Sequence, residues 1–131
     1  MLIVTTNDIP GYRIEAVLGE VMGMTVRSAN IGANFVAGFR AMGGGEVTEY
    51  TKLVYESRQQ VCQRMWEQAM QRGATAIVGA RFDTGSIGAQ FSEVCAYGTA
   101  VVAVPIPAGE TGSTPQSASD AYARVAPSPL P

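Results

Sequence analysis

The sequence predicts an α+β domain in which one long and one short helix pack on an antiparallel or mixed β-sheet. Three observations predict it: two extended segments open the chain, strong helical periodicity occupies its middle, and two strand-like segments follow. This order of strand, strand, helix, helix, strand, strand favours a layer of helices on one sheet. The 131 residues suffice for one compact domain of ordinary size.

The first two strands are expected at residues 2–6 and 13–28, with a turn over residues 8–11 between them. Apolar side chains alternate along much of the second segment, as they do in a strand with one buried face. The alternation slips around Gly19 and Gly23. Glycines inside a strand mark bulges or places where another backbone comes close, so we expect one or the other at these two positions.

Two helices are expected next, at residues 29–42 and 46–72, separated by three consecutive glycines. This glycine run lacks the Lys-Ser/Thr of a phosphate-binding loop, so it is interpreted as a connection. At 100° per residue, six apolar side chains of the second helix project within a stripe about 100° wide. They are Val47, Tyr50, Val54, Val61, Met65 and Ala69.

The ends of the long helix also carry helix signals. Glu46 and Glu49 suit the positive end of the helix dipole, Arg72 suits the negative end, and Gly73 stands where a left-handed C-terminal cap belongs. Cys62 lies at the edge of the apolar stripe. We therefore expect Cys62 to be a small core side chain.

The last two strands are expected at residues 75–83 and 92–104, with a glycine-rich turn over 84–88. Six of the seven prolines follow residue 104, in a segment rich in Ala, Ser, Thr and Gly. Such a composition buries little apolar surface, so residues 105–131 are predicted to be a flexible tail. The domain itself is expected to span residues 1–104.

Composition excludes several classes of function. Nine basic and eleven acidic residues give a net charge of −2, so neither nucleic acid nor a membrane is an expected partner. Without histidine, the chain cannot form a Ser-His-Asp triad, a Cys-His pair or a His-ligated metal site. An enzyme is therefore not expected. A hydrophobic content of 47% with 15% charged residues suggests that part of the surface is buried against other subunits.

The cysteines and the N-terminus indicate the compartment. Cys62 and Cys95 are too few for a disulfide framework and too far apart in sequence for a zinc or redox pair. The apolar run at residues 1–4 is too short for a signal peptide. We therefore expect a cytoplasmic protein.

Acidic side chains on the predicted strands are the candidates for cation binding. Asp83 and Glu93, together with Glu15 and Glu20, could converge across the sheet to bind a hard cation or to act as acid and base. Solvated strand faces or salt bridges between subunits are the alternative interpretation, since charges on half-exposed strands are common.

Arg58 projects near the middle of the apolar stripe of the long helix. Either its stem packs and its head reaches water, or its guanidinium meets a subunit boundary or a carboxylate on the sheet. Asp83 and Glu93 are the candidate partners, and Arg40 and Arg81 are placed in the same polar cluster.

A set of short motifs over most of residues 1–104 resembles the YbjQ family of small bacterial and archaeal proteins, some of whose members are labelled heavy-metal-binding. The matching residues are Ala29, Asn30, Ile31, Phe35, Ala37, Gly38, Arg40, Gly44, Gly45, Tyr50, Arg58, Gly73, Ala74, Ala76, Val78, Gly79, Arg81, Phe82, Asp83, Glu93, Tyr97, Gly98, Thr99, Ala100 and Val101.

The resemblance implies a dodecin-like subunit that assembles as a ring, specifically a homopentamer. It implies neither an activity nor a cofactor. The leading interpretation is a homo-oligomeric scaffold or small-ligand-binding protein. A metal-binding module using carboxylate and other oxygen ligands is the alternative, and an enzyme of unknown reaction comes third. Ligand-binding candidates are the polar residues that the resemblance covers, namely Asn30, Arg40, Arg58, Arg81, Asp83 and Glu93. Asp83 and Glu93 are the metal candidates.

Overall fold

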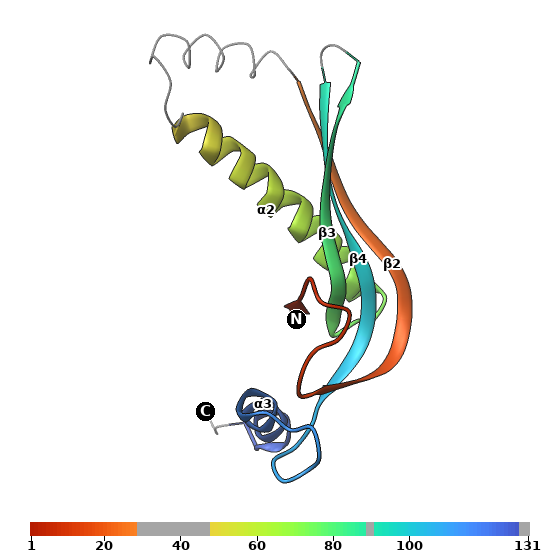
Figure 1. The fold of residues 1–131 in the computed structure, drawn as a ribbon, viewed down its shortest axis with the longest axis vertical. Helices are drawn as coiled ribbons and strands as arrows, with labels where there is room; N and C mark the ends of the chain where they lie inside the picture. The colour runs from red at the N-terminus through yellow and green to blue at the C-terminus, as the bar shows by residue number, and fades with distance from the viewer. Residues whose placement is uncertain (29–47, 89–90, 129–131) are drawn as a thin grey trace. The chain divides into compact units, whose positions relative to one another are not determined.

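The computed structural model describes residues 1–28, 48–88 and 91–128 as an α+β fold with a mixed four-stranded sheet and two helices (Figure 1). The elements are β1 (Leu2–Ile3), β2 (Tyr12–Ser28), α2 (Thr48–Gln71), β3 (Ala76–Ile87), β4 (Phe91–Pro105) and α3 (Pro115–Val125). The expected helix at residues 29–42 lies outside the described residues. Neither described helix has the length and apolar character needed to cross a membrane.

The sheet has the strand order β1-β3-β4-β2. The short strand β1 runs parallel to β3, with Leu2 opposite Ala76 and Ile3 opposite Ile77. The chain divides into two compact units that share the long strands. Unit 1 comprises Met1–Glu20, Ala69–Ala80 and Gly98–Pro131, and unit 2 comprises Val21–Gln68 and Arg81–Tyr97.

Unit 1 has its core where the ends of the strands meet. Its buried cluster consists of Ile9, Ala76, Val78, Val101 and Ala103, with Leu2, Val4, Tyr12 and Ile14 packed against it. The turn that enters β2 depends on Gly11, whose φ is +85°. A Cβ at this position would lie 2.5 Å from Oγ1 of Thr114, so only glycine lets the turn approach α3 this closely.

In unit 2, β2 packs directly on α2. Val21, Gly23 and Thr25 are buried, whereas Met22, Met24 and Val26 on the opposite face are exposed. A Cβ on Gly23 would lie 2.6 Å from the backbone nitrogen of Met65. The prediction of a close backbone approach at Gly23 is therefore confirmed.

The long helix has nearly the predicted bounds and the predicted C-terminal cap. Gly73 has a φ of +80°, its N–H donates to Met70 O at 2.9 Å, and the N–H of Ala74 donates to Ala69 O at 3.1 Å. These two bonds form a Schellman motif. Arg72 lies just past the helix and donates to the backbone oxygens of Leu18 and Glu20, on β2.

The apolar stripe of this helix is buried in its C-terminal half. Val61, Met65 and Ala69 are fully buried, whereas Val54 is exposed. Cys62 is half-buried rather than a full core residue. Among the stripe residues whose side chains are described, those from Val61 onward form the packed face of α2, and Val54 does not.

Two predictions need correction. β3 continues as a strand to Ile87. Of residues 84–88, where a turn was predicted, only Gly88 therefore lies outside the strand. The predicted flexible tail contains α3. The proline content argued against a helix in this segment. Pro115 is nevertheless compatible with α3, because it stands in the first turn, where the backbone N–H needs no partner within the helix.

A capping box begins α3. The Thr114 side chain accepts from the Ser117 N–H, while the Ser117 hydroxyl accepts from the Thr114 N–H at 2.9 Å. The Ser117 hydroxyl also lies 2.9 Å from Ile106 O, to which it can donate. Ser117 and Ala121 are the buried residues of the helix. Small side chains therefore hold α3 in place, which the low apolar content of the segment does not reveal.

Candidate functional site

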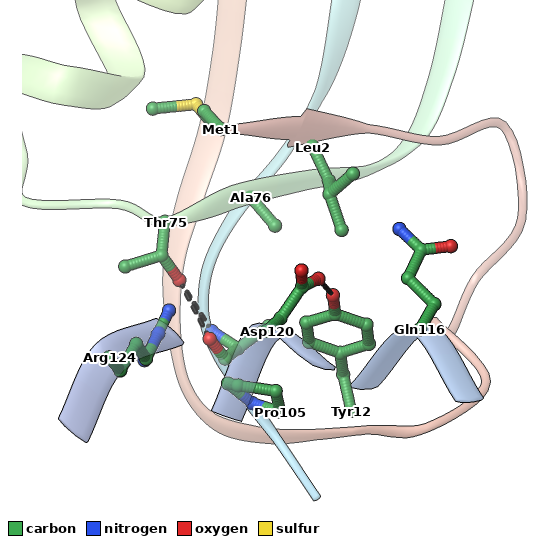
Figure 2. Close-up of a pocket in the computed structure, with 10 residues that line it drawn as sticks. Met1, Leu2, Tyr12, Thr75, Ala76, Pro105, Gln116, Asp120 and Arg124 are labelled. Carbon is green, nitrogen blue, oxygen red and sulfur yellow. Dashed lines mark hydrogen bonds between the residues drawn. The ribbon is translucent and has the colours of Figure 1, made fainter. Parts of the chain in front are cut away.

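A cavity of about 380 Å³ opens in unit 1 among α3 and the ends of the strands (Figure 2). Its apolar walls come from Met1, Leu2, Ala76, Ala103 and Pro105. Its polar groups come from Tyr12, Thr75, Gln116, Asp120 and Arg124. Small-molecule sites combine apolar walls with placed polar groups in volumes from about 300 Å³ upward, and this cavity has both kinds of lining in equal number.

Tyr12 and Asp120 form the central polar contact of the cavity. The Tyr12 hydroxyl donates a short hydrogen bond to Asp120 Oδ2, and Figure 2 shows the two side chains pointing toward each other. Burial, followed by the hydrogen bond and the charge of Asp120, raises the pKa of Tyr12, and the charge of Arg124 opposes this shift. Tyr12 therefore keeps its proton at neutral pH. Asp120 accepts the hydrogen bond from the Tyr12 hydroxyl with one of its two carboxylate oxygens.

The other polar side chains of the cavity differ in whether they already form hydrogen bonds within the protein. The Thr75 hydroxyl lies 3.0 Å from Ala103 O, to which it donates, and accepts from Ala103 N at 2.8 Å. For Arg124 and Gln116, residues 1–28, 48–88 and 91–128 supply neither a side-chain hydrogen bond nor an ion pair. These two side chains can therefore bind a ligand without first breaking such a contact.

The local structure explains how these groups meet. The Thr114 cap fixes where α3 begins, and four-residue spacing places Asp120 and Arg124 on one face of the helix. Tyr12 begins β2 directly after the Gly11 turn. The site thus joins residues from opposite ends of the chain.

Of the residues predicted as ligand-binding candidates, none that the structure describes lines this cavity. Asn30 and Arg40 are outside the described residues. Arg58, on α2, lies with its guanidinium carbon 5.1 Å from the centroid of the Phe82 ring. Arg81 and Asp83 are exposed on β3, and Glu93 is half-buried on β4.

The described structure does not place Arg58 in an ion pair with either of the two carboxylates considered as partners, Asp83 and Glu93. Arg58 is exposed and lies against Phe82 instead. Cation–π contact with a ring is worth about 0.5–1 kcal/mol at an exposed site.

The described side chains do not fit a heavy-metal site. Heavy metals favour thiolate ligands, which must lose their protons. Burial raises the pKa of the Cys62 thiol, which favours the protonated form, and Cys95 is buried. Within the described ranges, no three Cys, Asp or Glu residues gather closely enough to hold a metal ion, and Asp83 and Glu93 lack a third acidic neighbour.

Comparison with known proteins shows the family. A family model described as "Putative heavy-metal-binding" matches residues 1–104. The chain belongs to the YbjQ family. A UPF0145 protein of Acidothermus cellulolyticus is 55% identical over 100 residues, which cover 76% of this chain and 93% of the relative. A UPF0145 protein of Mycobacteroides abscessus is 52% identical over 106 residues, covering 81% of this chain and 99% of the relative.

A solved structure supports the YbjQ fold. It is a protein with unknown function of the DUF74 family from Pediococcus pentosaceus, and it aligns with a TM-score of 0.51 at 17% sequence identity. The alignment covers 78% of this chain and 96% of that one. At this identity, the likeness concerns the fold alone.

Helix α3 lies beyond the part of the chain that the YbjQ model matches. Gln116, Asp120 and Arg124 therefore come from the C-terminal extension. Sequence analysis missed all three because they lie in the predicted tail. The Thr114-Pro115 pair followed by Ser117 was the available signal, since it is typical of a helix start.

Proposed function

We propose that this YbjQ-family protein is a cytoplasmic homo-oligomeric scaffold whose subunits form a pentameric, dodecin-like ring. The observation that carries the proposal is the exposure of residues 81–87, which we call the outer part of β3. Residues 81–87 are exposed at every position, although they continue a strand whose first three residues, Ala76–Val78, are all buried. A strand segment exposed on both faces gains little from its own chain and is marginal by itself in water.

The side chains of unit 2 support contact with another subunit. Phe82, Ile87 and Phe91 are each more than 40% exposed, near the hairpin that joins β3 to β4. Met22, Met24 and Val26 are likewise exposed on the face of β2 opposite α2. Apolar side chains that gather on exposed strand faces favour a protein interface over open solvent.

The strand edges supply a way to continue the sheet. β2 is the last strand in the order β1-β3-β4-β2 and is 17 residues long. At the other side, β1 pairs with Ala76 and Ile77, and Gly79 and Ala80 donate to Thr6 and Val4. Within the described part of the chain, no strand is placed beyond β3 at residues 82–87.

The two edges differ, which favours a head-to-tail contact. Side chains of Gln68, Arg64 and Arg72 already bind the β2 edge over residues 18–24, so the part of β2 beyond Met24 is the part left for another strand. If residues 82–87 of β3 in one subunit lie along the part of β2 beyond Met24 in the next, each subunit uses both edges, and repetition of this contact closes a ring. The count of five rests on the family resemblance. The cytoplasmic location rests on the low cysteine content, which suits a reducing compartment.

Substitutions near the hairpin test the proposal. Ile87→Lys and Phe91→Lys place a charge in the proposed interface, whereas Val125→Lys, on α3, places one on a residue that is 83% exposed. Sedimentation velocity should show smaller assemblies for the first two variants and the wild-type species for the third. Far-UV circular dichroism checks that each variant folds. Unchanged sedimentation of both hairpin variants would contradict the proposed contact.

A further inference from the structure

The cavity of unit 1 contains two opposite charges that do not neutralise each other. Asp120 and Arg124 are four residues apart on α3, a spacing at which such side chains often form an ion pair. Here Asp120 is turned toward Tyr12, and no ion pair joins it to Arg124 among the described residues. Figure 2 shows Arg124 on the other side of Asp120 from Tyr12.

Asp120, Arg124 and Gln116 each have hydrogen-bonding groups left for a ligand. Asp120 accepts the hydrogen bond from the Tyr12 hydroxyl with Oδ2, which leaves Oδ1 as an acceptor for a ligand. Arg124 offers a planar guanidinium whose paired N–H groups match a carboxylate. The Gln116 amide adds a donor and an acceptor at the opposite side of the cavity.

The rest of the cavity is apolar. Leu2, Ala76 and Ala103 form walls beside the Tyr12 ring, and Ala76 and Ala103 belong to the buried core. Small alanine side chains leave room for an apolar group to pack against the Tyr12 ring. The arrangement is therefore an acceptor, a carboxylate-binding group and an apolar wall within a single volume of about 380 Å³.

We propose that this cavity binds a free amino acid with an apolar side chain, with its ammonium group at Asp120, its carboxylate at Arg124 and its side chain against the apolar wall. A zwitterion satisfies both charges at once, whereas an anion alone meets the repulsion of Asp120 and a cation alone meets that of Arg124. The site draws on the C-terminal extension, so it goes beyond the proposed assembly and does not depend on subunit count.

Three related probes test each contact separately. Phenylalanine carries both charged groups, 3-phenylpropionate lacks the ammonium, and 2-phenylethylamine lacks the carboxylate. Ligand-observed NMR titration should give phenylalanine an affinity at least tenfold higher than that of either partial probe. Equal affinities for the three probes, or no saturable binding of phenylalanine, would overturn the proposal.

Two variants that each remove one charge assign the contacts to residues. Arg124→Gln should reduce phenylalanine affinity to that of 2-phenylethylamine, and Asp120→Asn should reduce it to that of 3-phenylpropionate while keeping an acceptor for Tyr12. Lys52→Gln, on α2, removes one positive charge outside the cavity and should leave all affinities unchanged. Wild-type phenylalanine affinity in Arg124→Gln contradicts the assignment. If a variant does not fold, the probe series on the wild-type protein still decides.

Discussion

Replacing Gly23 by alanine tests the packing of β2 on α2. The added Cβ would lie 2.6 Å from Met65 N and 2.9 Å from Arg64 Cβ, and it would also strike Val61 O. Two of these three atoms belong to the helix backbone, so rotation of a side chain cannot relieve the contact. Either β2 or α2 must move by about 1 Å, because ordinary carbon contacts need about 3.5–4.0 Å.

Such a movement loosens a tightly packed neighbourhood. Val21, Val61 and Met65 are all at most 1% exposed, so separating the two elements removes contacts among them. Overpacking of this kind costs about 1–3 kcal/mol, and a backbone obstacle places Gly23→Ala near the upper end. Alanine also lowers the conformational entropy of the unfolded chain, which stabilises the folded state by about 0.4–1 kcal/mol. We expect a net loss of about 2 kcal/mol.

Urea unfolding followed by the fluorescence of Trp66, the only tryptophan, measures this loss. Gly85→Ala is the matched control, because a Cβ at Gly85 would meet no atom within 4 Å. Because Gly85 lies in the proposed subunit contact, sedimentation velocity first checks that this variant assembles as the wild type does. Both variants are compared at one protein concentration, since assembly makes stability depend on concentration. Equal midpoints for Gly23→Ala and Gly85→Ala would refute the close approach.

Three further predictions concern unit 1 and Arg58. Folding raises the pKa of Tyr12 above its usual value of 10.0. The stability that the protonated Tyr12 contributes is therefore complete below pH 10 and is lost as the pH rises through the raised pKa. Urea midpoints of Tyr12→Phe should not show this decrease at high pH. Deleting residues 107–131 removes α3 and should lower stability by about 2 kcal/mol through the hydrogen bonds of Asp120 and Ser117, whereas an unchanged melting temperature would show that α3 contributes nothing. Arg58→Met should cost less than about 1 kcal/mol in urea unfolding, and a loss of about 3 kcal/mol or more would indicate a buried charge pair instead.

Local signals predicted the parts of the fold that depend on neighbouring residues. The apolar stripe and Gly73 predicted the long helix and its C-terminal cap, because periodicity and capping are local properties. The slip in alternation marked Gly23 correctly. The sequence did not show which element approaches it, since Met65 lies 42 positions away.

The cavity could not be predicted, because it depends on contacts between the two ends of the chain. Tyr12 and Asp120 are 108 positions apart. Composition also misrepresented the C-terminal segment, since α3 packs through Ser117 and Ala121 rather than through large apolar residues. Helix-start signals at Thr114 and Pro115 were more informative there than hydrophobicity.

Assembly into a ring is the central claim, and native mass spectrometry of the purified full-length protein at micromolar concentration tests it most directly. A pentameric ring gives one dominant species with five times the 13.8 kDa chain mass. That result would agree with a sheet continued from the outer part of β3 to the β2 edge of the next subunit. A stable 13.8 kDa monomer under the same conditions would contradict the claim.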